Sequence, residues 1–177
     1  MFWKKMKRKI KETKKHITIG EAEIENGDPQ SIIEPLWWTV SIYDGEERYN
    51  KDLEKYSLPQ RYIFAIQWYA AEVKNGGHDQ FYYNSTGIVW KDALAGFKEI
   101  GHEEAYEILK ESANRLGGSP SMDRSERQKQ LDDTNADFGD LDCKFYEISD
   151  LDEVIMEYIK FHKKDFLFDG VVTIPGI

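Results

Sequence analysis

The stretch from Glu72 to Gly87 places the strongest constraint on the fold of this chain. It reads Glu-Val-Lys-Asn-Gly-Gly-His-Asp-Gln-Phe-Tyr-Tyr-Asn-Ser-Thr-Gly. Paired glycines suit the left-handed backbone that ends a helix, so we expect a helix to end at Asn75-Gly76-Gly77. After this turn, Gln80 and Asn84 are expected to bind exposed backbone groups, with Phe81 packed beneath them. The stretch is therefore interpreted as a corner that specifies the fold.

Hydrophobic periodicity predicts a mainly α protein, a single irregular bundle of about six to eight helices. A length of 177 residues favours one compact domain. The helix at 59–74 has apolar residues on several sides, which is typical of a central, buried helix. The helices are expected at residues 32–43, 59–74, 91–100, 102–116, 123–131 and 150–164, with a further segment at 134–146 that Gly139 interrupts.

Other segments lack a helical period. Residues 17–24 have weak extended character, residues 46–58 are interpreted as a polar connection, and the apolar tail from Phe166 to Ile177 is expected to pack irregularly. Ser31 is expected to cap the first helix. The single cysteine, Cys143, cannot form an intramolecular disulfide, which favours a reducing compartment, and we expect it in or near the core.

Charge is distributed unevenly along the chain. Residues 1–16 carry eight basic residues and one acidic residue, a net charge of +7, and are interpreted as a basic N-terminal arm. This arm is a solubilising terminus, a contact for a membrane surface or nucleic acid through Phe2 and Trp3, or a segment that folds back onto the body. Residues 17–177 carry 16 basic and 32 acidic residues and form one acidic domain. Such a body repels nucleic acid, so direct nucleic-acid binding by it is not expected.

An acidic segment lies between Ser121 and Glu157, where the sequence has twelve acidic and four basic residues. If they are helical, Asp133, Asp137 and Asp140 share one face. Asp150, Glu153 and Glu157 share another. Like charges at these spacings destabilise a helix by roughly a few tenths of a kcal/mol per pair. The segment is therefore either a solvated face or a docking surface for a basic partner, such as a DNA-binding protein.

Catalytic and metal-binding patterns are weak. The four histidines are scattered, and neither an HExxH spacing nor a cysteine cluster accompanies them, so we expect no metal and no cofactor. Glu72, His78 and Asp79 are the one group that suggests an acid/base site. Its nucleophile would be Ser85 or Thr86, and neither lies in a GxSxG elbow. An enzyme therefore remains the least favoured alternative.

A family resemblance emerges from three groups of residues. They are Pro59-Gln60-Arg61-Tyr62, the stretch Glu72–Gly87, and the pairs Ala93-Leu94 and Ile100-Gly101. Together they resemble the bacterial DNA-mimic protein family, over about residues 32–165. The residues that carry the motif, and that we interpret as mainly structural, are Glu72, Asn75, Gly76, Gly77, Gln80, Phe81, Asn84 and Gly87.

The resemblance implies a helical homodimer without catalytic activity. In that family, acidic side chains imitate the phosphates of duplex DNA and occupy the DNA-binding face of a transcription regulator. The basic arm departs from this pattern, because it weakens attraction to a basic partner. No individual mimic residue is implied by the motif.

Our leading hypothesis is a non-enzymatic cytoplasmic protein that binds a DNA-binding protein and competes with DNA. No run of apolar residues reaches the ~20 that a membrane-spanning helix needs, so no membrane span is expected. The alternative is an immunity or antitoxin-like protein that neutralises a basic toxin by the same electrostatics. The partner-binding residues predicted here are Asp133, Asp137, Asp140, Asp150, Glu153 and Glu157.

Overall fold

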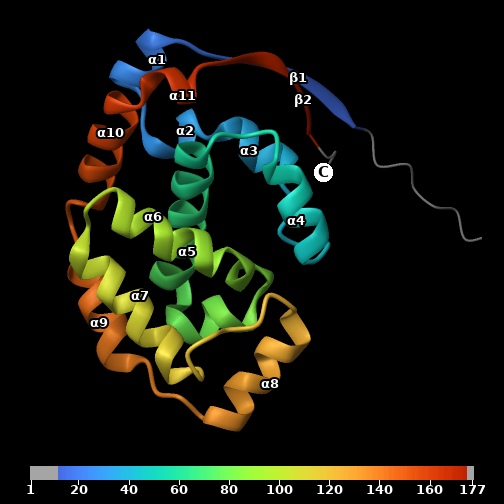
Figure 1. The fold of residues 1–177 in the computed structure, drawn as a ribbon. Coiled ribbons are helices and arrows are strands. Elements are labelled where there is room, and N and C mark those ends of the chain that lie inside the picture. Colours follow the sequence, from blue (N-terminus) through green and yellow to red (C-terminus); the bar gives the residue numbers. More distant parts are fainter. Residues whose placement is uncertain (1–11, 175–177) are drawn as a thin grey trace, which may run out of the picture.

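The computed structural model describes residues 12–174, and Figure 1 shows their arrangement. This part of the chain contains eleven α-helices and two strands, so the mainly α prediction is confirmed and the expected number of helices was too small. The elements are β1 (Thr13–Ile19), α1 (Glu21–Asn26), α2 (Pro29–Ile32), α3 (Glu34–Thr39), α4 (Glu46–Leu53), α5 (Leu58–Tyr83), the 3₁₀ helix η1 (Ser85–Val89), α6 (Trp90–Glu99), α7 (Glu103–Arg115), α8 (Arg124–Thr134), α9 (Gly139–Glu147), α10 (Leu151–Phe161), α11 (Lys163–Phe166) and β2 (Phe168–Ile174).

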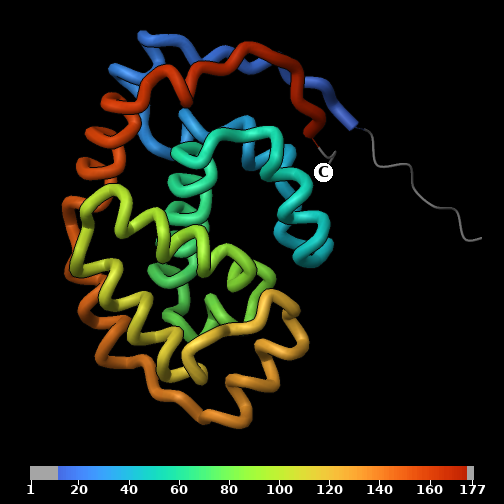
Figure 2. The backbone as a smooth tube through the Cα atoms, in the orientation of Figure 1, coloured from blue at the N-terminus to red at the C-terminus, as the bar shows by residue number. Residues whose placement is uncertain are grey.

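Helix α5 is the central element of the fold, and the other helices surround it in Figure 2. Its start is stabilised by a capping box, in which the Ser57 hydroxyl accepts from the Gln60 backbone and the Gln60 side chain accepts from the Ser57 backbone. The expected break at the glycines is present, since Gly76 (φ −158°, ψ 22°) and Gly77 (φ 75°, ψ −178°) are not helical. The chain nevertheless resumes as a helix from His78, so the expectation that the helix stops there was only half right.

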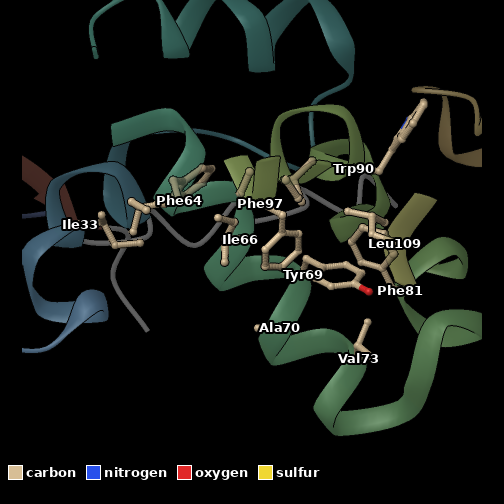
Figure 3. Packing of buried hydrophobic residues seen from close by; sticks show 14 of the residues in the cluster. Ile33, Phe64, Ile66, Tyr69, Ala70, Val73, Phe81, Trp90, Phe97 and Leu109 are labelled. Atoms are coloured by element: carbon tan, nitrogen blue, oxygen red, sulfur yellow. The ribbon is translucent and has the colours of Figure 1, made fainter. Parts of the chain in front are cut away.

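Aromatic rings form the centre of the core around Tyr69 of α5 (Figure 3). Tyr69 makes edge-to-face contacts with Phe81, Phe97 and Phe145 at ring-centroid distances of 5.0, 5.5 and 5.0 Å. Each such pair contributes about 0.5–1.5 kcal/mol beyond simple burial. Because the three partners come from α5, α6 and α9, this cluster joins the helices around the corner.

The two ends of the described chain pair as an antiparallel ribbon. Strands β1 and β2 run in register from Thr13 opposite Ile174 to Ile19 opposite Phe168. The expectation of an irregular tail was therefore wrong, and residues 13–16 of the predicted arm belong to β1. Two seven-residue strands so far apart in sequence have no local signal for their pairing. Residues 1–11 of the arm lie outside the described residues.

The first half of the chain is divided more finely than expected. In place of the predicted helix at 32–43 there are two short helices, α2 and α3, which cover residues 29–39 and leave residues 40–43 outside a helix. The cap of α2 is Asp28, whose carboxylate accepts from the Ser31 backbone at 3.0 Å. Ser31 lies inside α2 and not at its cap. Its hydroxyl accepts from the Asp28 backbone N–H, which completes a capping box. The predicted polar connection contains α4, whose apolar residues Tyr49 and Leu53 are too few to show a clear period.

The second half agrees better with its periodicity. Helices α6, α7, α8 and α10 lie within a few residues of the predicted ranges. Gly139 begins α9 rather than interrupting it, and Cys143 on this helix is exposed, contrary to the expected core position. Among residues 12–174, the structure contains no helix that is long and apolar enough to cross a membrane.

Candidate functional site

The corner at the glycine break of α5 is closed by one carboxylate. Oε1 of Glu72 accepts hydrogen bonds from Gln80 Nε2 at 2.7 Å and from Asn84 Nδ2 at 2.6 Å. The two amides therefore bind a side chain and not the backbone groups we expected. Phe81 is fully buried beneath this cluster, as predicted. The exposed Asn75 lies just before the turn.

The two glycines of the corner are required by close approaches. A Cβ on Gly76 would overlap the Gln80 side chain, and a Cβ on Gly77 would overlap the Asp142 carboxylate. Gly77 also has φ 75° with ψ −178°, a backbone region that is essentially restricted to glycine. The turn therefore allows α9 to pack directly against the backbone of α5.

Arg127 of α8 is buried beside the last motif glycine. A Cβ on Gly87 would overlap its guanidinium. This group donates to the backbone oxygens of Tyr82 at 2.7 Å, Asn84 at 2.6 Å and Ser121 at 2.6 Å. Burial lowers the pKa of Arg127 to about 10, so the side chain stays charged at neutral pH. Sequence analysis missed this residue, because an arginine in a polar helix has the same local pattern as a surface residue.

His78 connects the corner to the core and to α9. Its ring is buried, with Nε2 2.7 Å from the Tyr69 hydroxyl and Nδ1 2.5 Å from Oδ1 of Asp142. The same Asp142 oxygen accepts from the His78 backbone N–H at 2.9 Å. A neutral imidazole with its proton on Nδ1 satisfies every partner, because it donates to the carboxylate and accepts from tyrosine. The network therefore has a structural role.

The acid/base group suggested by the sequence does not assemble. The Glu72 carboxylate binds Gln80 and Asn84, while the His78 ring points into the core. Asp79, the third member, is exposed. The three side chains therefore share no site, and this arrangement does not favour the enzyme alternative.

The stability of the protein is expected to fall as pH is lowered from about 7.5 to about 5.5. Burial lowers the pKa of His78 below 6.5, although Asp142 opposes the shift. The unfolded chain therefore binds a proton in this window that the folded chain does not, and the free energy of unfolding decreases. Urea denaturation at a series of pH values measures the effect. The variant His78→Asn keeps a hydrogen-bond donor toward Asp142 but has no group that titrates in this window. Its free energy of unfolding should therefore change less with pH. An equal change with pH in both proteins would assign the effect to other groups.

The first predicted acidic group does not form a single helix face. Asp133 lies near the end of α8, Asp137 lies in the connection, and Asp140 lies in the first turn of α9. The physical reason for the break is Asn135, which has a left-handed backbone (φ 45°) and ends α8. All three residues are exposed.

Arg115 of α7 gathers two of these acidic residues. Its guanidinium binds Asp140 as a fork, with Nη1 2.5 Å from Oδ1 and Nη2 2.9 Å from Oδ2, and Nη1 also donates to the Asp137 backbone oxygen at 2.7 Å. The bond to Arg115 lowers the pKa of Asp140 to about 2. The Asp137 carboxylate accepts from the Gly139 backbone at 2.9 Å. Asp137 and Asp140 therefore also have local structural roles.

The second acidic group is closer to the prediction. Glu153 and Glu157 are exposed on α10, and Asp150 is the residue that precedes the helix. Asp150 lies 3.4 Å from Nε2 of His102, the residue at the start of α7. The beginnings of α7 and α10 are thus adjacent.

Helix α7 adds carboxylates that sequence analysis did not select. Glu104, Glu107 and Glu111 line a groove against α9, together with Arg115 and Lys144. Their spacing along one helix is visible in the sequence, but they lie before the acidic segment that begins at Ser121. In Figure 1, α10 and α9 follow one another down one side of the molecule with α7 beside α9, and α8 continues across its lower end. Carboxylates therefore occupy much of this continuous margin, which is called the acidic edge below.

Within residues 12–174, no group of three His, Cys, Asp or Glu side chains is arranged so that it could hold a metal ion.

The fold and these surfaces define a class of protein: mainly helical, with a motif that holds the corner together and with carboxylates displayed along one edge. The family model for the DMP19-like protein matches residues 54–162, more than half of the chain, and the chain belongs to this family. DMP19 is a DNA-mimic family, so the resemblance inferred from the motif is confirmed. The match is shorter than the expected region of 32–165. No curated protein and no solved structure matches the chain.

Proposed function

We propose that this protein is a DNA mimic that binds a DNA-binding protein, such as a transcription regulator, through the acidic edge formed by α7 to α10. Membership in a DNA-mimic family is the observation that carries the proposal. The six predicted partner-binding residues, Asp133, Asp137, Asp140, Asp150, Glu153 and Glu157, all lie inside the matched region and are exposed. No catalytic activity is part of this function.

Competition with DNA follows from the chemistry of the partner. A DNA-binding protein neutralises phosphates with lysine and arginine side chains, and carboxylates can occupy the same side chains. The fork between Arg115 and Asp140 is an internal example of the bidentate contact that a partner arginine would make. Carboxylates from several helices would present such contacts over an extended surface.

Reversing charge on this edge is expected to abolish capture of the partner. The test variant carries Asp133→Lys, Glu153→Lys and Glu157→Lys, because these exposed residues have no capping or bridging role described above. Each variant is immobilised and used to capture proteins from a lysate of the source cells, with and without competing duplex DNA. We expect the unmodified chain to retain a DNA-binding protein that duplex DNA displaces, and the variant to retain at least about tenfold less of it.

A matched control separates surface position from net charge. Glu46→Lys, Glu47→Lys and Glu54→Lys change the charge by the same amount on or just after α4, which lies on the opposite side of α5 from α9 and α10 in Figure 1. This control should retain the partner. Equal retention by both variants would remove the acidic edge from the proposal, and equal loss would indicate that overall charge governs binding.

The same experiment distinguishes the alternative function. A captured basic toxin that duplex DNA does not displace would favour an immunity or antitoxin-like role. A homodimer and a cytoplasmic location remain predictions that accompany the proposed function.

A further inference from the structure

Two cavities adjoin each other between the α3–α4 connection and the corner. The larger has a volume of about 620 Å³ and the smaller of about 230 Å³. Both are lined by Ile42, Tyr43 and Trp68, which therefore form the boundary between them. The larger is called the apolar chamber here, and its other apolar lining residues are Trp37, Trp38 and Val40. The smaller is called the polar chamber, and its other lining residues are Glu72, Asn84, Ser85, Thr86 and Arg124.

The polar chamber contains two opposite charges that are bound to different neighbours. Oε1 of Glu72 accepts from Gln80 and Asn84, whereas its Oε2 accepts no hydrogen bond from the described part of the chain. The Arg124 guanidinium donates through Nε to the Tyr83 backbone oxygen and lies over the Tyr83 ring. Its two terminal nitrogens have no partner among the residues that the structure describes. A carboxylate oxygen and a guanidinium edge thus line one chamber without neutralising each other.

A ligand with a single charge matches the polar chamber less well than a zwitterion. An anion at Arg124 would share the chamber with the Glu72 carboxylate, and a cation at Glu72 would share it with the guanidinium. One group then attracts the ligand while the other repels it, and a partly enclosed site screens charges less than bulk water does. A zwitterion pairs with both groups. The Ser85 hydroxyl, which also lines the chamber, adds a donor for a ligand carboxylate.

The apolar chamber is suited to an apolar group and not to a further charge. Its two carboxylates are already engaged, because Glu34 pairs with Lys15 and Asp28 caps α2. Tyr43 and Trp38 are 74% and 38% exposed. A hydrophobic group in this chamber would cover ring surface that otherwise contacts water, which is favourable. Apolar walls beside a few placed polar groups are the usual composition of a small-molecule site.

We propose that the two chambers form one site for a free α-amino acid with a large apolar side chain. The ammonium group of the ligand binds Oε2 of Glu72, and its carboxylate binds the terminal nitrogens of Arg124. Its side chain passes Tyr43 and Trp68 into the apolar chamber. Glu72 of the family motif thus has a ligand-binding role in addition to closing the corner. The inference uses none of the six predicted partner-binding carboxylates and does not rest on the proposed function.

Isothermal titration calorimetry with the full chain tests the chemistry of the ligand. The probe is L-phenylalanine, and three analogues each lack one of its parts. Phenylethylamine lacks the carboxylate, 3-phenylpropionate lacks the ammonium group, and glycine lacks the side chain. We expect L-phenylalanine to bind and each analogue to bind at least about tenfold more weakly, since each loses a charged or an apolar contact. Absence of L-phenylalanine binding, or equal affinity for the analogues, would overturn the proposal.

Two substitutions connect each charge of the ligand to its residue. Arg124→Leu should weaken L-phenylalanine at least about tenfold and leave phenylethylamine within about twofold, because only the former has a carboxylate. Glu72→Gln keeps an acceptor for Gln80 and Asn84 but removes the charge. It should weaken L-phenylalanine and leave 3-phenylpropionate within about twofold. If Glu72→Gln does not fold, Arg124→Leu still decides the outcome, because it leaves the corner intact.

Matched control variants locate the site. Lys129→Leu removes a positive charge from another exposed position on α8, and should bind L-phenylalanine like the unmodified chain. Tyr43→Ala removes the ring between the chambers and should weaken binding, whereas Tyr146→Ala removes an exposed ring from α9 and should not. The proposal is wrong if Lys129→Leu weakens binding as much as Arg124→Leu, or if Tyr146→Ala weakens it as much as Tyr43→Ala.

Discussion

Replacing Arg127 with leucine is expected to lower the free energy of unfolding by roughly 4 kcal/mol, or to prevent folding. The side chain is fully buried and donates to backbone oxygens of Tyr82, Asn84 and Ser121. Leucine removes all of these donors, and each carbonyl left without a partner costs about 1–3 kcal/mol. Relief of the buried charge offsets part of the loss.

Arg124→Leu is the matched control for this substitution. Arg124 lies on the same helix but is exposed, with a bond to the Tyr83 backbone oxygen at 3.0 Å and its guanidinium over the Tyr83 ring. We expect it to cost no more than about 1 kcal/mol. Urea denaturation followed by circular dichroism measures both variants. If Arg127→Leu were as stable as the control, the guanidinium would not be the group that holds η1 and α8 against the corner.

Replacing Gly77 with alanine is expected to cost roughly 4 kcal/mol. The backbone at φ 75° and ψ −178° contributes about 1–3 kcal/mol of strain with any side chain. The new Cβ would also displace the Asp142 carboxylate, which accepts from the backbone and the ring of His78. Loss of those bonds leaves two donors of His78 without a partner in the interior.

Gly45→Ala separates the two contributions to this cost. Gly45 has nearly the same backbone, φ 84° and ψ 174°, but no atom lies within 4 Å of an added Cβ. We expect Gly45→Ala to lose only the free energy that corresponds to backbone strain. Gly77→Ala should lose about 2 kcal/mol more, as measured from the midpoints of urea unfolding curves that have the same m value. Equal losses would mean that the contact with Asp142 adds nothing to the requirement for glycine.

The quality of sequence prediction differed between parts of the candidate site. The corner was predicted because a pair of glycines has a local consequence for the backbone. The contacts that hold the corner together could not be predicted. The side chains packed against Gly77 and Gly87 are those of Asp142 and Arg127, which are distant from the two glycines in sequence. The acidic residues were identified by composition, but the left-handed Asn135 separates Asp133 from Asp137 and Asp140, which a continuous helix would have aligned.

The sequence by itself determined the mainly helical class, the central helix as far as its glycine break, and the family, because these depend on periodicity, turn chemistry and a contiguous motif. Only the tertiary structure decided the pairing of β1 with β2, the burial of Arg127, and the assembly of Trp37, Trp38 and Trp68 around one cavity. These features join segments that lie far apart along the chain. Their free energy comes from burial and hydrogen bonds that exist only after the helices pack, so no local pattern reports them.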